Sequence, residues 1–152
     1  MNVVEDSIVQ PNGIAISPDE KTIYISDTGA ISGPIAMSLG YQGARVNATG
    51  KRIIYAYNVS DDAMYISNKR PVYLAQDWVP DGLKVARNGY IVTGAGKGVD
   101  VLDCYGTLLV RVQTNYTVQN FAWTGTDYKT LWIVGQGGIS KVEWNLQGQE
   151  LK

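Results

Sequence analysis

The sequence predicts an all-β fold built from about three four-stranded units, the repeating element of a β-propeller. The first observation is a repeat, because residues 10–26, 79–93 and 118–134 align with one another. Each segment has an Asn or Asp after a short lead, then an apolar strand, a polar turn and a second apolar strand. The second observation is that no stretch keeps an apolar period of about 3.6 residues over successive turns, so no amphipathic helix is expected.

The spacing of the repeat fits propeller blades. The aligned polar residues are Asn12, Asp81 and Asn120, and the last two lie 39 residues apart, close to the ~40–45 residues of a blade. Asn12 and Asp81 lie 69 residues apart, so the first unit needs an insertion. Residues 29–50, rich in Gly, Ser, Ala and Asn, are predicted to form it as a long surface loop. Such loops are often functional, and an insertion without function is the alternative.

Runs of β-branched and aromatic residues place the remaining strands. In chain order these are 52–58 and 72–75 in the first unit, 99–102 and 108–113 in the second, and 139–144 with a final strand near Glu150 in the third. Tyr105-Gly106 is predicted as a turn. The glycine-rich run from Gly94 to Gly98 lacks the spacing of a phosphate-binding loop and is predicted as a hairpin turn.

The whole chain, residues 1–152, is therefore predicted to form one partial propeller domain. Propellers close with ~4–8 blades, so that no long strand edge stays open. Three blades leave open faces, and open edges promote self-association. Either partner chains complete the ring, or the sequence is part of a longer product.

Composition and charge exclude several classes of partner. The chain has 152 residues, of which 45% are hydrophobic and 18% charged, an ordinary globular balance. The net charge is −1, and the basic residues are scattered, which argues against a nucleic-acid partner. No apolar run approaches the ~20 residues of a membrane span, so no membrane partner is expected. The start of the chain shows no signal-peptide pattern.

The reactive residue types are few. The sequence contains no histidine, which excludes Ser-His-Asp and Cys-His catalysis and histidine zinc sites within this chain. Any metal must be held by oxygen, which points to calcium or magnesium. Cys104 is the one cysteine and is predicted to be a small buried hydrophobe. The compartment stays open, although sequons at Asn47, Asn58 and Asn115 suggest secretion.

Four phrases resemble the gluconolactonase and senescence-marker-protein (SMP-30) family. They are Pro11 to Asp19 followed by Ile23 to Thr28, Pro80 to Val85 followed by Asn88-Gly89-Tyr90, Gly98 to Leu102 with Gly106-Thr107-Leu108, and Val118 to Trp123 with Leu131-Trp132-Ile133. Their order and spacing at blade starts make the combination specific, and the resemblance covers nearly the whole chain. The insertion after Gly29 is similar to that of fungal members.

The resemblance implies a six-bladed propeller, of which this chain is the C-terminal half. It implies metal-dependent hydrolysis of a sugar lactone or related cyclic ester, with a small-molecule lactone as substrate. One alternative is a non-catalytic propeller fragment or interaction module without a full metal site. Another is a different chemistry on the same scaffold, as in strictosidine-synthase-like proteins, because fold does not fix function.

The resemblance also implies a site. The family holds one divalent metal on the central axis, here most simply Ca²⁺, through a Glu, two Asn and one Asp. Asn12 matches the Asn of the Pro-Asn-Gly motif as a metal ligand. Asp81 matches the Asp of the Pro-Asp-Gly motif as a metal ligand and the catalytic base. The Glu and the second Asn have no counterparts here, and Glu5 stands in the wrong context to be assigned.

Each of these residues also has a structural interpretation. Asn12-Gly13 and Asp81-Gly82 are ordinary turn dipeptides. Asn120 is expected to cap a strand or line the central channel, and Asp27 to be a turn residue. The four tryptophans, at strand spacing, are expected in the core rather than stacked on a sugar-like ligand: Trp78, Trp123, Trp132 and Trp144.

Overall fold

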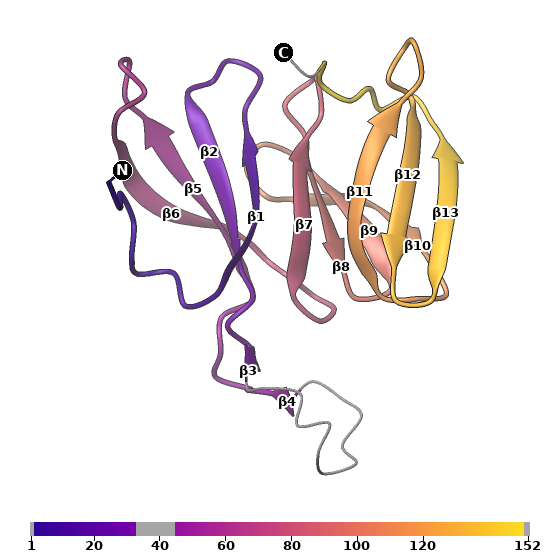
Figure 1. The fold of residues 1–152 in the computed structure, drawn as a ribbon, viewed down its shortest axis with the longest axis horizontal. Helices are drawn as coiled ribbons and strands as arrows, with labels where there is room; N and C mark the ends of the chain where they lie inside the picture. The colour runs from indigo at the N-terminus through magenta and orange to yellow at the C-terminus, as the bar shows by residue number, and fades with distance from the viewer. Residues whose placement is uncertain (1, 33–44, 151–152) are drawn as a thin grey trace.

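A computed structural model describes residues 2–32 and 45–150, and within these residues it contains strands and no helix. Three antiparallel sheets stand side by side (Figure 1). The first sheet contains β1 (Pro11–Ile16), β2 (Thr22–Asp27), β5 (Ile53–Val59) and β6 (Ile66–Leu74) in that order. The second contains β7 (Pro80–Val85), β8 (Ile91–Ala95), β9 (Gly98–Leu102) and β10 (Leu108–Gln113). The third contains β11 (Val118–Thr124), β12 (Thr130–Gly135) and β13 (Gly138–Glu143).

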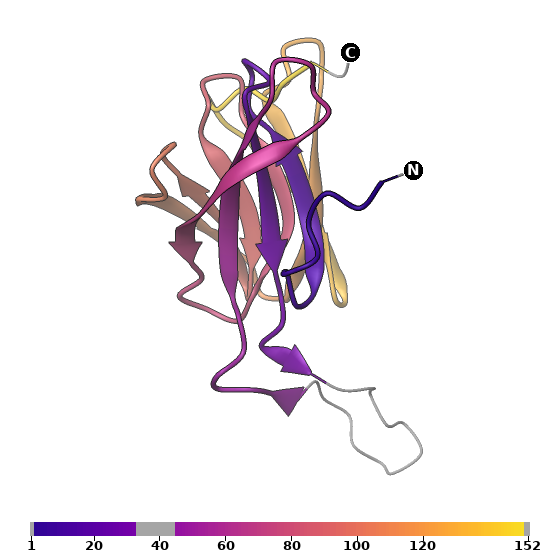
Figure 2. The ribbon, with the colours of Figure 1, turned by 90° about the vertical axis from the view of Figure 1, so that its left-hand side faces the viewer.

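This arrangement confirms the prediction of successive propeller blades. Each sheet is a meander that starts with its innermost strand, and the innermost strands β1, β7 and β11 lie next to one another (Figure 1). The side view looks onto the first sheet, with the other two sheets behind it (Figure 2). Two sheets have four strands and the third has three within the described residues.

The predicted final strand near Glu150 is wrong. After β13 the chain crosses to the other two sheets instead, where Gly148 forms an isolated bridge with Ala86. The Gln149 side chain donates from Nε2 to the carbonyl oxygens of Ile16 (3.0 Å) and Val85 (3.1 Å). These hydrogen bonds satisfy carbonyl groups at the ends of β1 and β7, so the tail links the third sheet to both inner strands.

The core lies in the two spaces between the sheets. Tyr24, Ile54, Leu83 and Ile91 are among the residues buried between the first and second sheets. Between the second and third sheets, Phe121 packs edge-on to Trp123, and Trp123 stacks on Trp144 with 6.4 Å between ring centroids. Trp78 is half-buried. The core prediction is wrong for Trp132, whose side chain is 45% exposed on the outer face of the third sheet.

The structure confirms two predicted turns and contradicts the predicted burial of Cys104. The run from Gly94 to Gly98 forms the β8–β9 hairpin, with Gly96 at a φ of 55°. The β9–β10 turn contains Gly106 at a φ of 92° and is held by Asp103, whose Oδ1 accepts two backbone N–H groups. Cys104 lies in that turn and is exposed, so the prediction of a buried thiol is wrong.

The predicted insertion begins as a ribbon rather than a plain loop. β3 (Ile31–Ser32) pairs with β4 (Arg45–Val46) below the first sheet (Figure 1). The rest of the predicted loop, residues 33–44, lies outside the described residues. Asp27 pairs with both Pro11 and Ile53, so the ribbon leaves the first sheet at the level where β1 begins.

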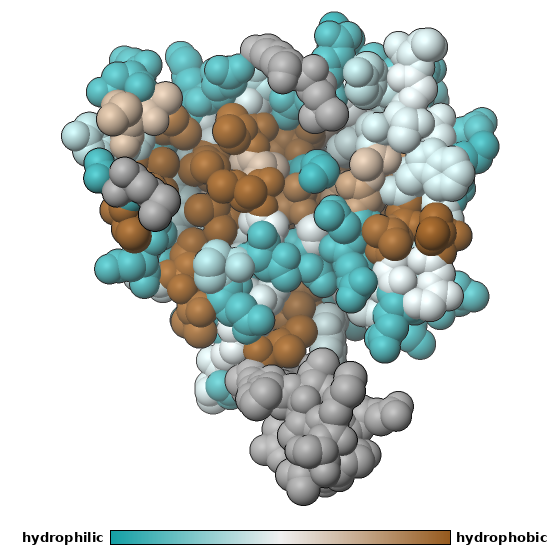
Figure 3. All heavy atoms as spheres, in the orientation of Figure 1, coloured by the Kyte–Doolittle hydropathy of each residue, from teal (hydrophilic) through white to brown (hydrophobic). Residues whose placement is uncertain are grey.

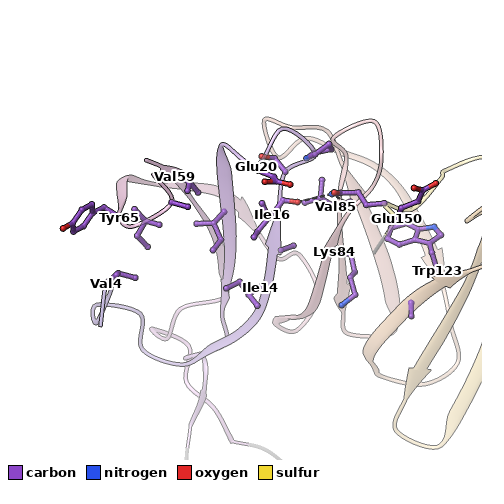
Figure 4. Close-up of a pocket in the computed structure, with 18 of the residues that line it drawn as sticks. Val4, Ile14, Ile16, Glu20, Val59, Tyr65, Lys84, Val85, Trp123 and Glu150 are labelled. Atoms are coloured by element: carbon purple, nitrogen blue, oxygen red, sulfur yellow. Dashed lines mark hydrogen bonds between the residues drawn. The ribbon is translucent and has the colours of Figure 1, made fainter. Parts of the chain in front are cut away.

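The front of the molecule carries a broad apolar surface over β1 and β7 (Figure 3). It is hollowed into a cavity of about 810 Å³ whose lining includes Ile14, Ile16, Val85 and Trp123 (Figure 4). Ile14 is 60% exposed there. An exposed apolar surface of this kind is what an incomplete ring of blades leaves uncovered.

The described residues include no helix long and apolar enough to cross a membrane.

Candidate functional site

A second, polar cavity of about 540 Å³ opens where the three inner strands begin. Asn12 on β1, Asp81 on β7 and Asn120 on β11 all line it, together with Gln119 and Lys84. The structure therefore brings together both predicted metal ligands, which are far apart in sequence. It also brings Asn120, which we expected to serve as a cap or channel residue.

The same backbone irregularity places all three side chains. The register of each inner strand against its neighbour shifts by one residue at this level: between Pro11 and Ile14 on β1, between Pro80 and Leu83 on β7, and between Val118 and Asn120 on β11. Such bulges bend a strand and redirect a side chain, and they occur often beside functional sites. Asn12-Gly13 and Asp81-Gly82 thus lie within bulged strands, and the alternative interpretation as turn dipeptides is wrong.

Two glycines let the inner strands approach closely. A Cβ atom on Gly13 would lie 2.5 Å from the Asp81 carbonyl oxygen and 2.6 Å from the Leu83 Cβ. A Cβ atom on Gly82 would lie 2.7 Å from both the Gln119 carbonyl oxygen and the Asn120 Oδ1. These glycines therefore bring the three polar side chains to one cavity, because larger residues would force the strands apart.

Gly13→Ala is expected to lower the free energy of unfolding by about 1–3 kcal/mol, since the new methyl group overlaps rigid backbone. It should also separate Asn12 from Asp81 and weaken any response to calcium. Urea unfolding with and without calcium measures both effects. The control is Gly89→Ala, where the φ of 88° is unfavourable but nothing lies within 4 Å of the added Cβ. The control should leave the calcium response unchanged, and an equal loss in both variants would contradict the steric explanation.

Two buried hydroxyl groups support the bulges, and we did not predict either from the sequence. Ser26 on β2 accepts the Gly13 N–H at 2.7 Å, and its Oγ lies 3.2 Å from the Asp81 carbonyl oxygen. Thr93 on β8 donates to the Gly82 carbonyl oxygen at 3.2 Å. Both residues follow the second apolar run of their repeat. A hydroxyl at the same repeat position in two units was the signal that could have revealed them.

The Asp81 carboxyl group has a shifted pKa. Burial of the carboxyl group raises its pKa above the ordinary value, and a hydrogen bond from the Asn12 side chain opposes this effect. Asn12 itself is exposed at the cavity. The pair thus combines a partly desolvated carboxylate with an amide that favours the charged form of that carboxylate.

Asp27 and Glu5 serve the structure outside the cavity. Asp27 is buried, and its carboxylate accepts the N–H groups of Val9 (3.1 Å), Gln10 (3.1 Å) and Gly29 (3.0 Å). It thereby fixes the segment that leads into Asn12 and the root of the insertion. Glu5 lies 3.7 Å from Lys69 in an ion pair, and hydrogen bonds from Ser7 lower its pKa to about 2. Its position agrees with leaving Glu5 unassigned.

The cavity offers part of a site for a hard cation. Asn12 contributes an amide oxygen, Asp81 contributes a carboxylate, and Asn120 contributes an amide group whose oxygen accepts the Phe121 N–H. In the part of the chain that is described, no three His, Cys, Asp or Glu residues converge. Oxygen donors of these types suit calcium or magnesium, and further ligands would have to come from water or from other protein segments.

The fold and the cavity together define a β-propeller segment with a polar cavity at its inner strands. The family described as SMP-30/Gluconolactonase/LRE-like region matches residues 31–136. The match covers more than half of the chain, and the chain belongs to this family.

Relatives of known sequence or structure agree with this assignment. The chain is 46% identical to the lactonohydrolase oryH of Aspergillus oryzae over 155 residues, which cover 100% of this chain and 33% of the relative. It is 46% identical to the lactonohydrolase oryL of the same organism, with 97% and 34% covered. It superimposes on XC5397, a gluconolactonase from Xanthomonas campestris, with a TM-score of 0.66, 27% identity, and 88% and 37% covered. The chain thus spans about a third of the curated relatives that it matches.

Proposed function

We propose that this chain supplies Asp81 and Asn12 to the active site of a metal-dependent hydrolase of a sugar lactone or related cyclic ester. The observation that supports this function best is the convergence of these two residues in one polar cavity. Burial raises the pKa of the Asp81 carboxyl group, and the neighbouring Asn12 side chain opposes this rise. Membership in a family that contains lactonohydrolases and gluconolactonases supports the substrate class.

Ring opening of a lactone requires a polarised carbonyl group and an activated water molecule. A bound divalent metal, most simply Ca²⁺, would supply the polarisation and lower the pKa of water. Asn12 and Asp81 are the residues of this chain that would hold it. Asp81 would accept the proton of the attacking water, and its raised pKa makes it a better base than an ordinary aspartate. Asn12 would lie beside the Asp81 carboxylate in the cavity and favour its charged form.

A non-catalytic propeller module is the second candidate. Two observations favour it for the chain by itself. Among the described residues one carboxylate lines the polar cavity, whereas Ca²⁺ usually takes ~6–8 oxygen ligands. The broad apolar surface on the front is also suited to another protein segment.

Thermal unfolding of the chain with calcium and with a chelator distinguishes the two candidates. A ligand that binds the folded state alone stabilises it by about 2.7 kcal/mol at a hundredfold excess over Kd. The proposed function predicts such an increase in calcium, together with hydrolysis of glucono-lactone that the chelator removes.

The test variant is Asp81→Asn, which should lose the calcium response. Its matched control is Asp61→Asn, which removes an exposed carboxylate in the β5–β6 turn at the opposite end of the first sheet. It should keep both the calcium response and the hydrolysis. A cooperative transition that is indifferent to calcium, without hydrolysis, would instead support the non-catalytic module.

A further inference from the structure

We infer that Asn120 is a third ligand-binding residue of the polar cavity and that its amide Nδ2 donates to an acceptor oxygen of the bound lactone. The inference rests on the proposed function and extends it to β11. It requires the bound lactone to have an acceptor oxygen, from a carbonyl or hydroxyl group, on the side that faces β11.

The position of Asn120 supports a binding role. It is the repeat equivalent of Asn12 and Asp81, it follows the same bulge, and it lines the same cavity. Its Cα and Oδ1 lie within 2.9 Å of the place where a Cβ on Gly82 would stand. The Asn120 side chain therefore lies against the backbone of β7, one residue from Asp81, in space that is open because residue 82 is glycine.

The orientation of the amide group supports the donor role. Oδ1 accepts the N–H of Phe121 at 2.9 Å, so the oxygen is turned toward the strand backbone. The Nδ2 group carries two donor hydrogens. Among the residues that the structure describes, no side chain or carbonyl group forms a hydrogen bond with it. The exposed Asn120 thus presents unused donors at the cavity.

The chemistry of the cavity explains why a donor is needed there. Asp81 presents carboxylate oxygens, which repel the oxygen atoms of a lactone and of the hydroxy acid that hydrolysis releases. A neutral amide donor on the neighbouring strand gives those oxygens a partner without adding charge. A site that hydrogen-bonds a substrate oxygen also discriminates strongly against analogues that lack it.

The test compares Asn120→Ala and Asn120→Asp with the unmodified chain. The alanine variant removes the whole amide group, whereas the aspartate variant keeps an oxygen for the Phe121 N–H and removes the donor. The control is Asn88→Asp, because the Asn88 Oδ1 likewise accepts a nearby backbone N–H, that of Tyr90 at 3.2 Å, in an exposed turn. The measurements are KM and kcat for glucono-lactone, calorimetric affinity for gluconate, and the calcium-induced shift in unfolding temperature.

We expect both Asn120 variants to raise KM and weaken gluconate binding by about three- to tenfold, the usual effect of losing one hydrogen bond to a ligand. The calcium-induced shift should persist in Asn120→Ala, and the control should match the unmodified chain. Loss of the calcium shift in Asn120→Ala would overturn the donor role, because Asn120 would then be a metal ligand. Unchanged KM and gluconate affinity in Asn120→Asp would overturn it in favour of a structural role.

The proposed function can fail separately. An unmodified chain that neither hydrolyses glucono-lactone nor binds gluconate would overturn both the function and this inference. An active unmodified chain with unaffected Asn120 variants would overturn the inference alone.

Discussion

Replacing Asp100 with alanine is expected to lower the free energy of unfolding by about 3–5 kcal/mol, because it removes one partner of a buried ion pair. Asp100 on β9 is fully buried. Its carboxylate accepts the Arg111 Nε at 2.6 Å, the Arg111 Nη2 at 3.2 Å and the Tyr73 hydroxyl at 2.7 Å. Tyr73 lies on β6 and Arg111 on β10, so this group connects the first and second sheets. Urea unfolding measures the loss.

Tyr73→Phe is the matched variant for this prediction. Burial and the hydrogen bond to Asp100 raise the pKa of Tyr73, so the hydroxyl stays neutral and removing it deletes one hydrogen bond. The expected cost is about 1 kcal/mol. A double-mutant cycle of Asp100→Ala with Arg111→Ala should show strong coupling, because the two side chains share one network. Additive losses would contradict the description of Asp100 as the centre of this network.

The sequence was sufficient for the fold because one signal was repeated. Three copies of the same apolar and polar pattern, around Asn12, Asp81 and Asn120, placed the inner strands correctly. The errors lie where a single segment had no repeat to compare with. The tail around Gly148 is such a segment, and in the structure the Gln149 side chain donates instead to the carbonyl oxygens of Ile16 and Val85.

Exposure was harder to predict than secondary structure. Strand spacing predicts a core position for Trp132 and residue type predicts one for Cys104, yet both residues are exposed. Trp132 alternates with buried neighbours on β12 and points to the outer face of the last sheet, where no further sheet covers it in the described structure. Cys104 lies in a tight turn, where local hydrogen bonds to Asp103 determine the conformation instead of burial.

The sequence predicted which residues form the candidate site, but it did not predict how the backbone and the neighbouring strands position them. Asn12 and Asp81 were identified by resemblance, and the structure places them in one cavity. The bulges, the support from Ser26 and Thr93, and the orientation of Asn120 depend on backbone register and on contacts between strands. A sequence without homologues to compare carries no direct record of such features.

Asp81→Asn is expected to reduce lactone hydrolysis by about 10²–10⁴-fold, the usual contribution of a general base. The same variant should be more stable than the unmodified chain at neutral pH in a chelator. Burial raises the pKa of Asp81, so the folded state binds this proton more tightly than the unfolded state does. Ionisation of Asp81 therefore lowers the free energy of unfolding. This loss is absent at pH values below the pKa of Asp81 in the unfolded state, grows as pH rises through its pKa in the folded state, and is complete above that pKa. Asparagine is neutral and carries no such cost.

Calcium should make the unmodified chain more stable than Asp81→Asn, the reverse of the order expected in a chelator. This reversal distinguishes a metal-binding role of Asp81 from a purely structural one. In a chelator at neutral pH the unfolding temperature of Asp81→Asn should exceed that of the unmodified chain. The two temperatures should converge at pH values well below the ordinary aspartate pKa of about 3.9. In excess calcium the unmodified chain should gain stability through binding, while the variant gains little. A structural aspartate would instead leave the variant less stable under every condition. Such a result would contradict the role of Asp81, since functional residues characteristically reduce the stability of the unliganded fold.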